Sequence, residues 1–300
     1  MQIPRWNVFK KPLAYVSMIS FTADKSGRID GIIASSNNLS RSFVASLIDQ
    51  GKVRLNKNVC YKSSTKVHEG DKINLDFSPQ QLTDIPEISL PILYEDDDCL
   101  VIEKPIGLLT HSKGAFNPEA TVSSFIRPYT KEMEDNRGGI VHRLDRITSG
   151  VLICAKTPEA LTWLQKQFSQ RKNKKTYYAV VQGKPQPNKA LIDIPIERNP
   201  NKPQTFRAGV NGKTAKTTYE VEQTNGNYSL LKLQPETGRT HQLRVHMSYI
   251  KHPILGDELY GGQPAERVYL HANKLEITLP NRQRKVFECP VPDLFKAKVS

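Results

Sequence analysis

The chain has 300 residues, and its 43 lysines and arginines outnumber its 30 aspartates and glutamates to give a formal net charge of +13. This excess favours polyanionic partners, and the 38% of hydrophobic residues excludes a mainly disordered chain. No segment approaches the roughly 18 apolar residues of a membrane span, and the basic start lacks the apolar run of a secretion signal. We therefore expect a cytoplasmic protein that binds no membrane. The four cysteines lie far apart with no paired spacing, which argues against a disulfide framework and a thiolate zinc site.

The first region, residues 13–77, predicts a small α+β domain. The expected elements are, in chain order, a strand over 16–22, two short helices over 28–51, two short β segments over 53–61 and a strand over 73–77. Ser40 is the expected N-cap of the second helix, and Gly51 is expected to close it. Prolines among polar residues over 78–91 predict a linker.

Basic residues of this region would form a strip across one face. The segments RIDGIIAS, LSRSFVASLIDQGKVRLNKNV and KVHEGDKINL resemble the S-four-type RNA-binding domain, which is named after a small-subunit ribosomal protein. The residues that we expect to contact RNA here are Arg28, Arg41, Lys52 and Arg54. The alternative is a charged surface that only keeps the protein in solution.

The second region, residues 92–300, predicts a mixed, mainly antiparallel sheet with peripheral helices, because strand-like runs follow one another through short turns. The expected strands lie in CLVIEKP, GVLICAK, TYYAVVQG, TTYEVEQ, YSLLKLQP, VYLHANKLEITLP and KVFECP. The clearest amphipathic helix is TPEALTWLQKQF, opened by Thr157 with Pro158 in its first turn.

Most of the positive charge lies in one part of this region. Residues 160–219 contain twelve basic and two acidic residues, interleaved with aromatic ones. This pattern predicts a groove for a nucleic-acid backbone, with places where bases stack. The basic residues that we expect at RNA are Lys172, Lys174 and Lys175, and the aromatic ones that interleave with the charge are Tyr177, Tyr178, Phe206 and Tyr219.

The segment GGIVHRLDRITSGVLICAKT holds one carboxylate, Asp145, between Arg143 and Arg146. Neighbouring guanidinium groups can keep such a carboxylate ionised. Taken alone, the string fits a surface salt bridge beside a turn as well as it fits an active site.

Four segments, which follow one another in the order of a known family, favour the active site over the surface salt bridge. HRLDRITSG resembles the active-site motif of the RluA family of RNA pseudouridine synthases, and LYEDDDCLVIEKPIGLLTHS resembles its opening motif. KKTYYAVVQG is similar to its tyrosine motif, and PETGRTHQLRVHM with HPILGDELYGG is similar to its third motif. The resemblance implies that Asp145 attacks or deprotonates the nucleoside and that Arg143 replaces the flipped uridine in the stack. It also implies that Tyr177 packs on the uridine ring and that Arg244 pairs with Asp145.

Other site types fit the sequence less well. His241, His246, His252 and His271 with Asp257 have the elements of a metal site but not its spacing. His111 and His142 suit hydrogen bonds that hold loops better than acid catalysis. Glycine motifs that bind nucleotide phosphates are missing, and isomerisation needs no cofactor. Two functions of other classes remain as alternatives, a catalytically silent ribosome-assembly factor that binds RNA in the same groove and a metal-dependent RNA hydrolase.

The resemblance also suggests a substrate. Members of the family with the additional N-terminal domain often act on large-subunit ribosomal RNA, so we expect 23S-type rRNA rather than tRNA. The chain contains no sequence feature that indicates an obligatory protein partner.

Overall fold

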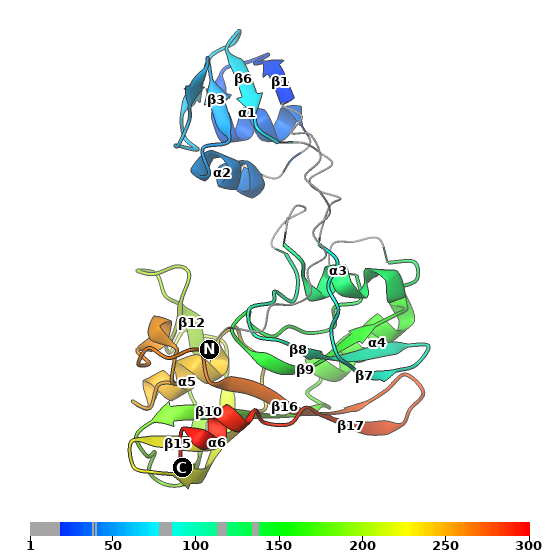
Figure 1. Cartoon of the computed structure of the whole chain (residues 1–300), viewed down its shortest axis with the longest axis vertical. Helices are drawn as coiled ribbons and strands as arrows, with labels where there is room; N and C mark the ends of the chain where they lie inside the picture. Colours follow the sequence, from blue (N-terminus) through cyan, green and yellow to red (C-terminus); the bar gives the residue numbers. More distant parts are fainter. Residues whose placement is uncertain (1–18, 38, 40, 78–85, 113–118, 134–137) are drawn as a thin grey trace. The chain divides into compact units, whose positions relative to one another are not determined.

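The computed structural model describes residues 19–37, 39, 41–77, 86–112, 119–133 and 138–300 (Figure 1). The chain divides into two compact units. The first comprises Met1–Ser89, His111–Phe125 and Asp135–Arg137, and the second comprises Leu90–Thr110, Ile126–Glu134 and Gly138–Ser300. Residues 13–18 of the expected first domain, its expected N-cap Ser40 and residues 78–85 of the expected linker lie outside the described residues.

The described part of residues 1–89, in the first unit, contains two helices and two small sheets. Its elements are β1 Ile19–Thr22, β2 Gly27–Arg28, α1 Ile29–Ser36, α2 Arg41–Asp49, β3 Val53–Leu55, β4 Asn58–Val59, β5 Lys66–Val67 and β6 Lys72–Leu75. The larger sheet has the strand order β1-β6-β3-β4, and β2 pairs with β5. The two helices and the hairpin expected from the sequence are therefore present.

Spacing along the two helices explains how this unit packs. Ile29, Ile32 and Ile33 of α1 lie in one buried cluster with Ile48 of α2 and Ile73 of β6. Positions three and four apart share one face of a helix, so this apolar face is turned to the sheet. The hairpin between β3 and β4 turns through two residues with positive φ, 49° and 74°, which is the conformation that tight two-residue hairpins require.

The second unit is built on a nine-stranded sheet (Figure 1). Its strands are β7 Ile92–Glu95, β8 Cys99–Lys104, β9 Ser149–Ala155, β10 Lys174–Gln182, β11 Lys189–Asp193, β14 Lys216–Thr224, β15 Tyr228–Pro235, β16 Leu270–Thr278 and β17 Arg284–Glu288. The order is β11-β14-β15-β10-β16-β9-β8-β7, with β17 also paired to β16. Among the described strands of this sheet, only β16 and β9 are parallel, so the expected mixed, mainly antiparallel sheet is confirmed.

Short helices and one hairpin accompany this sheet. The remaining elements of the second unit are the 3₁₀ turn η2 Arg127–Tyr129, α4 Pro158–Ser169, the hairpin β12 Ile196–Arg198 and β13 Phe206–Ala208, α5 Gln242–Tyr249, the 3₁₀ turn η3 Glu258–Tyr260 and α6 Asp293–Ala297. Helix α3, Val122–Ile126, belongs to the first unit except for its last residue. The predicted N-cap of α4 is confirmed, because Thr157 Oγ1 accepts a hydrogen bond from the Ala160 amide. Ala160 and Leu164 of α4 are buried in one cluster with Ile153 of β9 and Leu275 of β16.

Gly150 allows the single parallel pair to form. Its φ is +117°, and a Cβ at this position would lie 2.1 Å from the Ala272 carbonyl oxygen on β16. A side chain would therefore separate β9 from β16. The loop before β9 carries Asp145, so this close approach fixes where that loop enters the sheet.

Candidate active site

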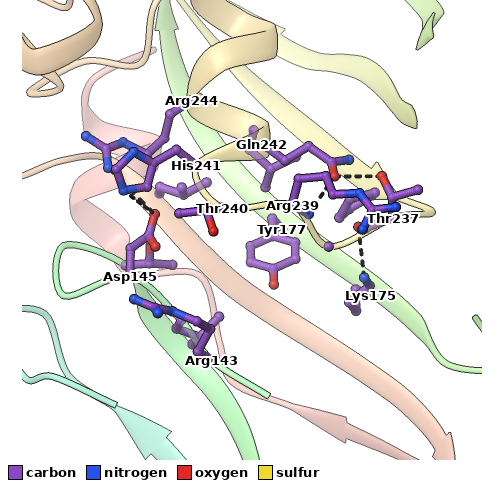
Figure 2. A pocket seen from close by; sticks show the side chains of 16 residues that line it. Arg143, Asp145, Lys175, Tyr177, Thr237, Arg239, Thr240, His241, Gln242 and Arg244 are labelled. Carbon is purple, nitrogen blue, oxygen red and sulfur yellow. Dashed lines mark hydrogen bonds and ion pairs between the residues drawn. The ribbon is translucent and has the colours of Figure 1, made fainter. Parts of the chain in front are cut away.

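A pocket opens on one face of β10 beside the N-terminus of α5 (Figure 2). Four segments far apart in sequence meet there: the loop before β9, the start of β10, the segment from the end of β15 into α5, and the start of β16. The lining side chains used below are Arg143, Asp145, Lys175, Tyr177, Thr237, Arg239, His241, Gln242 and Arg244. The pocket therefore gathers all four residues expected to be catalytic.

The loop that carries Asp145 is fastened to the segment after β8. Thr110 Oγ1 donates to the Leu144 carbonyl at 2.8 Å and accepts from the Leu144 amide at 3.2 Å. The Gly107 amide donates to the Arg146 carbonyl at 2.7 Å. Residues on both sides of Asp145 are thus held by the backbone or side chains of residues 107–110, which restricts where its carboxylate can point.

Lys104 anchors that fastening segment from inside the protein. Its side chain is fully buried, and Nζ donates to the carbonyls of Pro105 at 2.7 Å and Leu108 at 2.8 Å. Burial lowers the pKa of Lys104 to about 7, although the negative charge of Asp145 acts in the opposite direction. A buried amine at the end of an apolar strand therefore holds together the turn that supports the Asp145 loop.

The expected pairing of Arg244 with Asp145 is present as a longer contact. Arg244 Nη1 lies 3.6 Å from Asp145 Oδ2, whereas Arg244 Nε and Nη2 donate to Asp257 at 2.7 and 2.8 Å. The side chain of Asp257 is 1% exposed and that of Asp145 is 18% exposed. The main partner of Arg244 is therefore Asp257, which binds Nε and Nη2. The remaining nitrogen, Nη1, faces Asp145.

Tyr177 and Lys175 lie on the pocket face of β10. The Lys175 ammonium donates to the Thr237 carbonyl at 3.1 Å, and burial lowers the pKa of Lys175 to about 8, assisted by the positive charge of Arg171. Burial, and next the charge of Asp145, raises the pKa of the Tyr177 phenol, so this hydroxyl stays protonated. Tyr178 faces the other side of the sheet and donates to Glu222, as strand alternation predicts.

Arg143 is exposed at the pocket. Within the described part of the chain its guanidinium makes no hydrogen bond or ion pair, although it lies two residues from Asp145. Arg244 differs from it, because two hydrogen bonds to Asp257 hold the Arg244 guanidinium in place. Figure 2 shows Asp145 between these two arginines.

The expected RNA groove over 160–219 is not one surface. Lys174 lies on the opposite face of β10 from Lys175 and pairs with Glu276 at 3.7 Å, because successive strand residues point to opposite faces. Lys172 lies beside Trp163 in a separate hollow. Tyr219 is 3% exposed in the core, so the expectation that it stacks with a base is wrong.

In the first unit, two of the expected RNA-binding residues share one carboxylate. Arg28 and Arg41 each contact Asp30 at 3.0 Å, and their own side chains remain 54% and 60% exposed. The hydrogen bond from Arg28, partly opposed by burial, lowers the pKa of Asp30. Lys52 is half-buried and Arg54 is exposed.

Sequence reasoning missed the parts played by Lys104, His241, Asp257 and Tyr260. Lys104 follows Glu103 and Asp257 precedes Glu258 in otherwise mainly apolar segments, and a charged residue in such a segment can signal a buried anchor. His142 holds its loop as expected, since its Nε2 accepts from the Ile153 amide at 3.3 Å and its ring stacks on Phe168.

The described residues hold neither a cluster suited to a metal ion nor a helix suited to a membrane. No group of three or more His, Cys, Asp or Glu side chains is arranged to hold a metal ion in the described ranges. Within the same ranges, no helix has the length and apolar character needed to cross a membrane.

Comparison with known proteins identifies the family. The family described as RNA pseudouridylate synthase matches residues 98–249, and the S4 domain matches residues 27–73. Ribosomal large subunit pseudouridine synthase D of Vibrio parahaemolyticus is 36% identical over 287 residues, which are 89% of this chain and 88% of that protein. The protein of the same name from Borreliella burgdorferi is 39% identical over 249 residues, 78% of this chain and 76% of that protein.

A solved structure extends this likeness to the fold. Human RNA Pseudouridylate Synthase Domain Containing 4 has a TM-score of 0.56 and 27% identity, and the match covers 69% of this chain and 90% of that chain. The chain belongs to the RNA pseudouridine synthase family and carries an N-terminal S4 domain. It is an isomerase, and the expected family and fold class are confirmed.

The Arg244 pair gives a stability prediction. We expect Arg244→Met to lower the free energy of unfolding by about 3 to 5 kcal/mol, because it leaves the buried Asp257 carboxylate without its partner. The double variant Arg244→Met with Asp257→Leu should recover at least half of this loss. Urea unfolding measures both. Arg239→Met is the control, since Arg239 makes one exposed bond to the Thr214 carbonyl and should cost less than about 1 kcal/mol. An Arg244→Met variant with the same free energy of unfolding as the wild type would contradict a buried pair of Arg244 and Asp257.

Lys104 gives a pH prediction. Its pKa is about 7 when folded and 10.5 as its ordinary value, so between these limits the unfolded chain holds a proton that the folded chain releases. The free energy of unfolding should therefore rise with pH through this window. From pH 7 to 9.5, the wild type should gain about 3 kcal/mol relative to Lys104→Met, measured by urea unfolding at both pH values. A difference between the two proteins that does not change with pH would contradict the lowered pKa.

Proposed function

We propose that this protein converts uridine to pseudouridine in large-subunit ribosomal RNA, that it works in the cytoplasm, and that Asp145 is the reacting carboxylate. Both curated relatives described above carry the name ribosomal large subunit pseudouridine synthase D, which supports this choice of RNA. The reaction as proposed uses no cofactor, metal ion or obligatory protein partner.

The chemistry is an exchange of one glycosidic bond for another. The bond between N1 and C1′ breaks, the detached base turns, and a bond forms between C5 and C1′. The hydrogen on C5 leaves and N1 gains one, so substrate and product are isomers and no oxidant is consumed. A carboxylate can serve either by bonding to the nucleoside or by taking its proton, and both roles require the ionised form.

The observation that carries the proposal is the surroundings of Asp145. Its carboxylate lies in a pocket that Tyr177 also lines, with Arg244 Nη1 3.6 Å from its Oδ2. Arg244 therefore places a positive charge beside the carboxylate that is proposed to react. The aromatic ring of Tyr177 offers a flat apolar surface on which a uracil ring can stack.

Access to the target requires that the nucleotide leaves its stack. Extrusion of the uridine costs a few kcal/mol. Part of this cost is offset when another flat group occupies the space that the uridine leaves in the base stack. Arg143 suits that role because its planar guanidinium is exposed beside Asp145 and is free of protein partners among the described residues. We propose that Lys175, at the pocket, and the more distant Lys172 and Lys174 contribute charge toward the RNA backbone, with Lys174 acting from the opposite face of the sheet.

We propose that Arg28, Arg41, Lys52 and Arg54 of the S4 domain bind RNA phosphates. Arg28 and Arg41 are exposed although both touch Asp30, so each still presents part of its guanidinium to solvent. Asp30 fixes the position of the two side chains and offsets one of their charges. This surface adds affinity without taking part in the reaction.

The role of Asp145 leads to a kinetic prediction. Asp145→Asn should abolish pseudouridine formation in single-turnover assays on ribosomal RNA fragments while RNA affinity changes by less than about threefold, because the amide keeps the shape but loses the charge. Elemental analysis of the same protein tests the alternative of a metal-dependent hydrolase. A variant that retained a tenth of the wild-type rate would refute the assignment. A wild-type protein that bound the RNA but never modified it would support the silent assembly factor.

The role of the S4 domain leads to a binding prediction. Arg41→Ala with Arg54→Ala should weaken RNA binding and reduce the slope of log affinity against log salt by roughly 1.5, since each lost phosphate contact removes about 0.7 to 0.9. The rate at saturating RNA should stay at the wild-type value. Asp145→Asn is the matched control, with the wild-type salt slope but no turnover. An unchanged slope, or a lower saturated rate, would overturn this division of roles.

A further inference from the structure

His241 is joined to a chain of hydrogen bonds that starts on the hairpin β12–β13. The Phe206 amide donates to the Tyr260 hydroxyl oxygen at 3.0 Å, and this oxygen lies 2.7 Å from His241 Nδ1. Within the described ranges the Tyr260 hydroxyl has no other partner. The hydroxyl satisfies its own proton within the protein when it donates to Nδ1, and a neutral ring that accepts at Nδ1 carries its proton on Nε2.

The other end of the ring faces Asp145. His241 Nε2 lies 3.8 Å from Asp145 Oδ2, the same oxygen that is 3.6 Å from Arg244 Nη1. Figure 2 shows both side chains approaching the Asp145 carboxylate from the α5 side. These distances exceed a hydrogen bond, but such contacts are often long in a free enzyme and tighten when substrate binds.

The ring is also held in place by its neighbours. Its side chain is 17% exposed, and it meets the rings of Phe206 and Tyr260 edge to face with centroids 5.6 Å apart in both cases. Burial lowers the pKa of His241 in spite of the opposing charge of Asp145. The ring is accordingly neutral at pH 7. The titratable and charged groups that act on the ring are Asp145, Arg143, Arg244, Asp257 and Tyr260.

We propose that His241 is a positioning residue for Asp145. In the complex with RNA, its neutral Nε2–H donates to Asp145 Oδ2 beside Arg244 and thereby leaves Oδ1 to face the nucleoside. The hydroxyl of Tyr260 selects the required tautomer. This inference rests on the proposed role of Asp145 in the reaction.

The backbone of His241 provides a test that separates this role from a structural one. Its φ is +58°, a left-handed conformation that asparagine tolerates better than glutamine. Asparagine places its amide near the position of Nδ1 and cannot reach Asp145, whereas glutamine can place an N–H near the position of Nε2. If the role of His241 is structural, His241→Asn should reduce the rate less than His241→Gln does. If His241 acts as a donor, His241→Gln should reduce the rate less than His241→Asn does.

The experiment measures single-turnover rate, RNA affinity and thermal midpoint for both variants, for Tyr260→Phe and for the wild type. We expect His241→Asn and Tyr260→Phe to be folded, to bind RNA within about threefold of the wild type and to react at least tenfold more slowly. His241→Gln should react within about fivefold of the wild type, even if its melting temperature is lower. A rate for His241→Asn equal to or above that of His241→Gln would overturn the proposal.

The proposed function fails in a different way. If Asp145→Asn, measured beside these variants, kept its activity while the His241 variants behaved as expected, the carboxylate assignment would be wrong. If Asp145→Asn were inactive and all three variants reacted like the wild type, only the inference about His241 would be lost.

Discussion

One buried guanidinium organises the catalytic unit. Arg244 is 4% exposed, and a charge removed from water to this degree must be paired and hydrogen-bonded. Asp257 supplies the bidentate partner, which ties α5 to the turn at η3, and Tyr260 from the same turn lies with its ring 4.7 Å from the guanidinium carbon. The remaining edge of the guanidinium faces Asp145. The protein thus satisfies Arg244 without using Asp145, so the second carboxylate stays available in the pocket.

The sheet determines where that carboxylate stands. Gly150 lets β9 approach β16 closely enough to pair in parallel. Gly107 and Thr110, in the segment after β8, bind the backbone on either side of Asp145, and Lys104 holds that segment. Lys104 shows the cost of this arrangement, because burial lowers the pKa of its amine to about 7. A loop held by these hydrogen bonds lies next to an exposed Arg143 that has no partner among the described residues, and this fits a reaction in which the carboxylate stays in place while a nucleotide moves.

Seven of the nine strands of the larger sheet and α4 could be predicted from sequence because alternation and an N-cap are local signals. The sequence did not predict β7, β11 or the hairpin β12–β13. Helix α5 could not, since six of its eight residues are buried, including Gln242, Arg244 and His246, and such a helix has no polar face. The choice of Asp257 as the partner of Arg244 depends on tertiary contacts between residues 13 apart. The basic run over 160–219 was misleading for a related reason. Its charges are continuous in sequence, but the strand pleat sends Lys174 and Lys175 to opposite faces.

We propose that this chain modifies large-subunit ribosomal RNA and that Asp145 carries out the chemistry. The most direct measurement maps pseudouridines at nucleotide resolution in total RNA from cells that lack the gene and are supplied with either the wild-type or the Asp145→Asn protein. We expect specific pseudouridines in large-subunit rRNA to disappear without the gene, to return with the wild-type protein and to stay absent with Asp145→Asn. Sites that were lost only from tRNA, or that returned with Asp145→Asn, would contradict it.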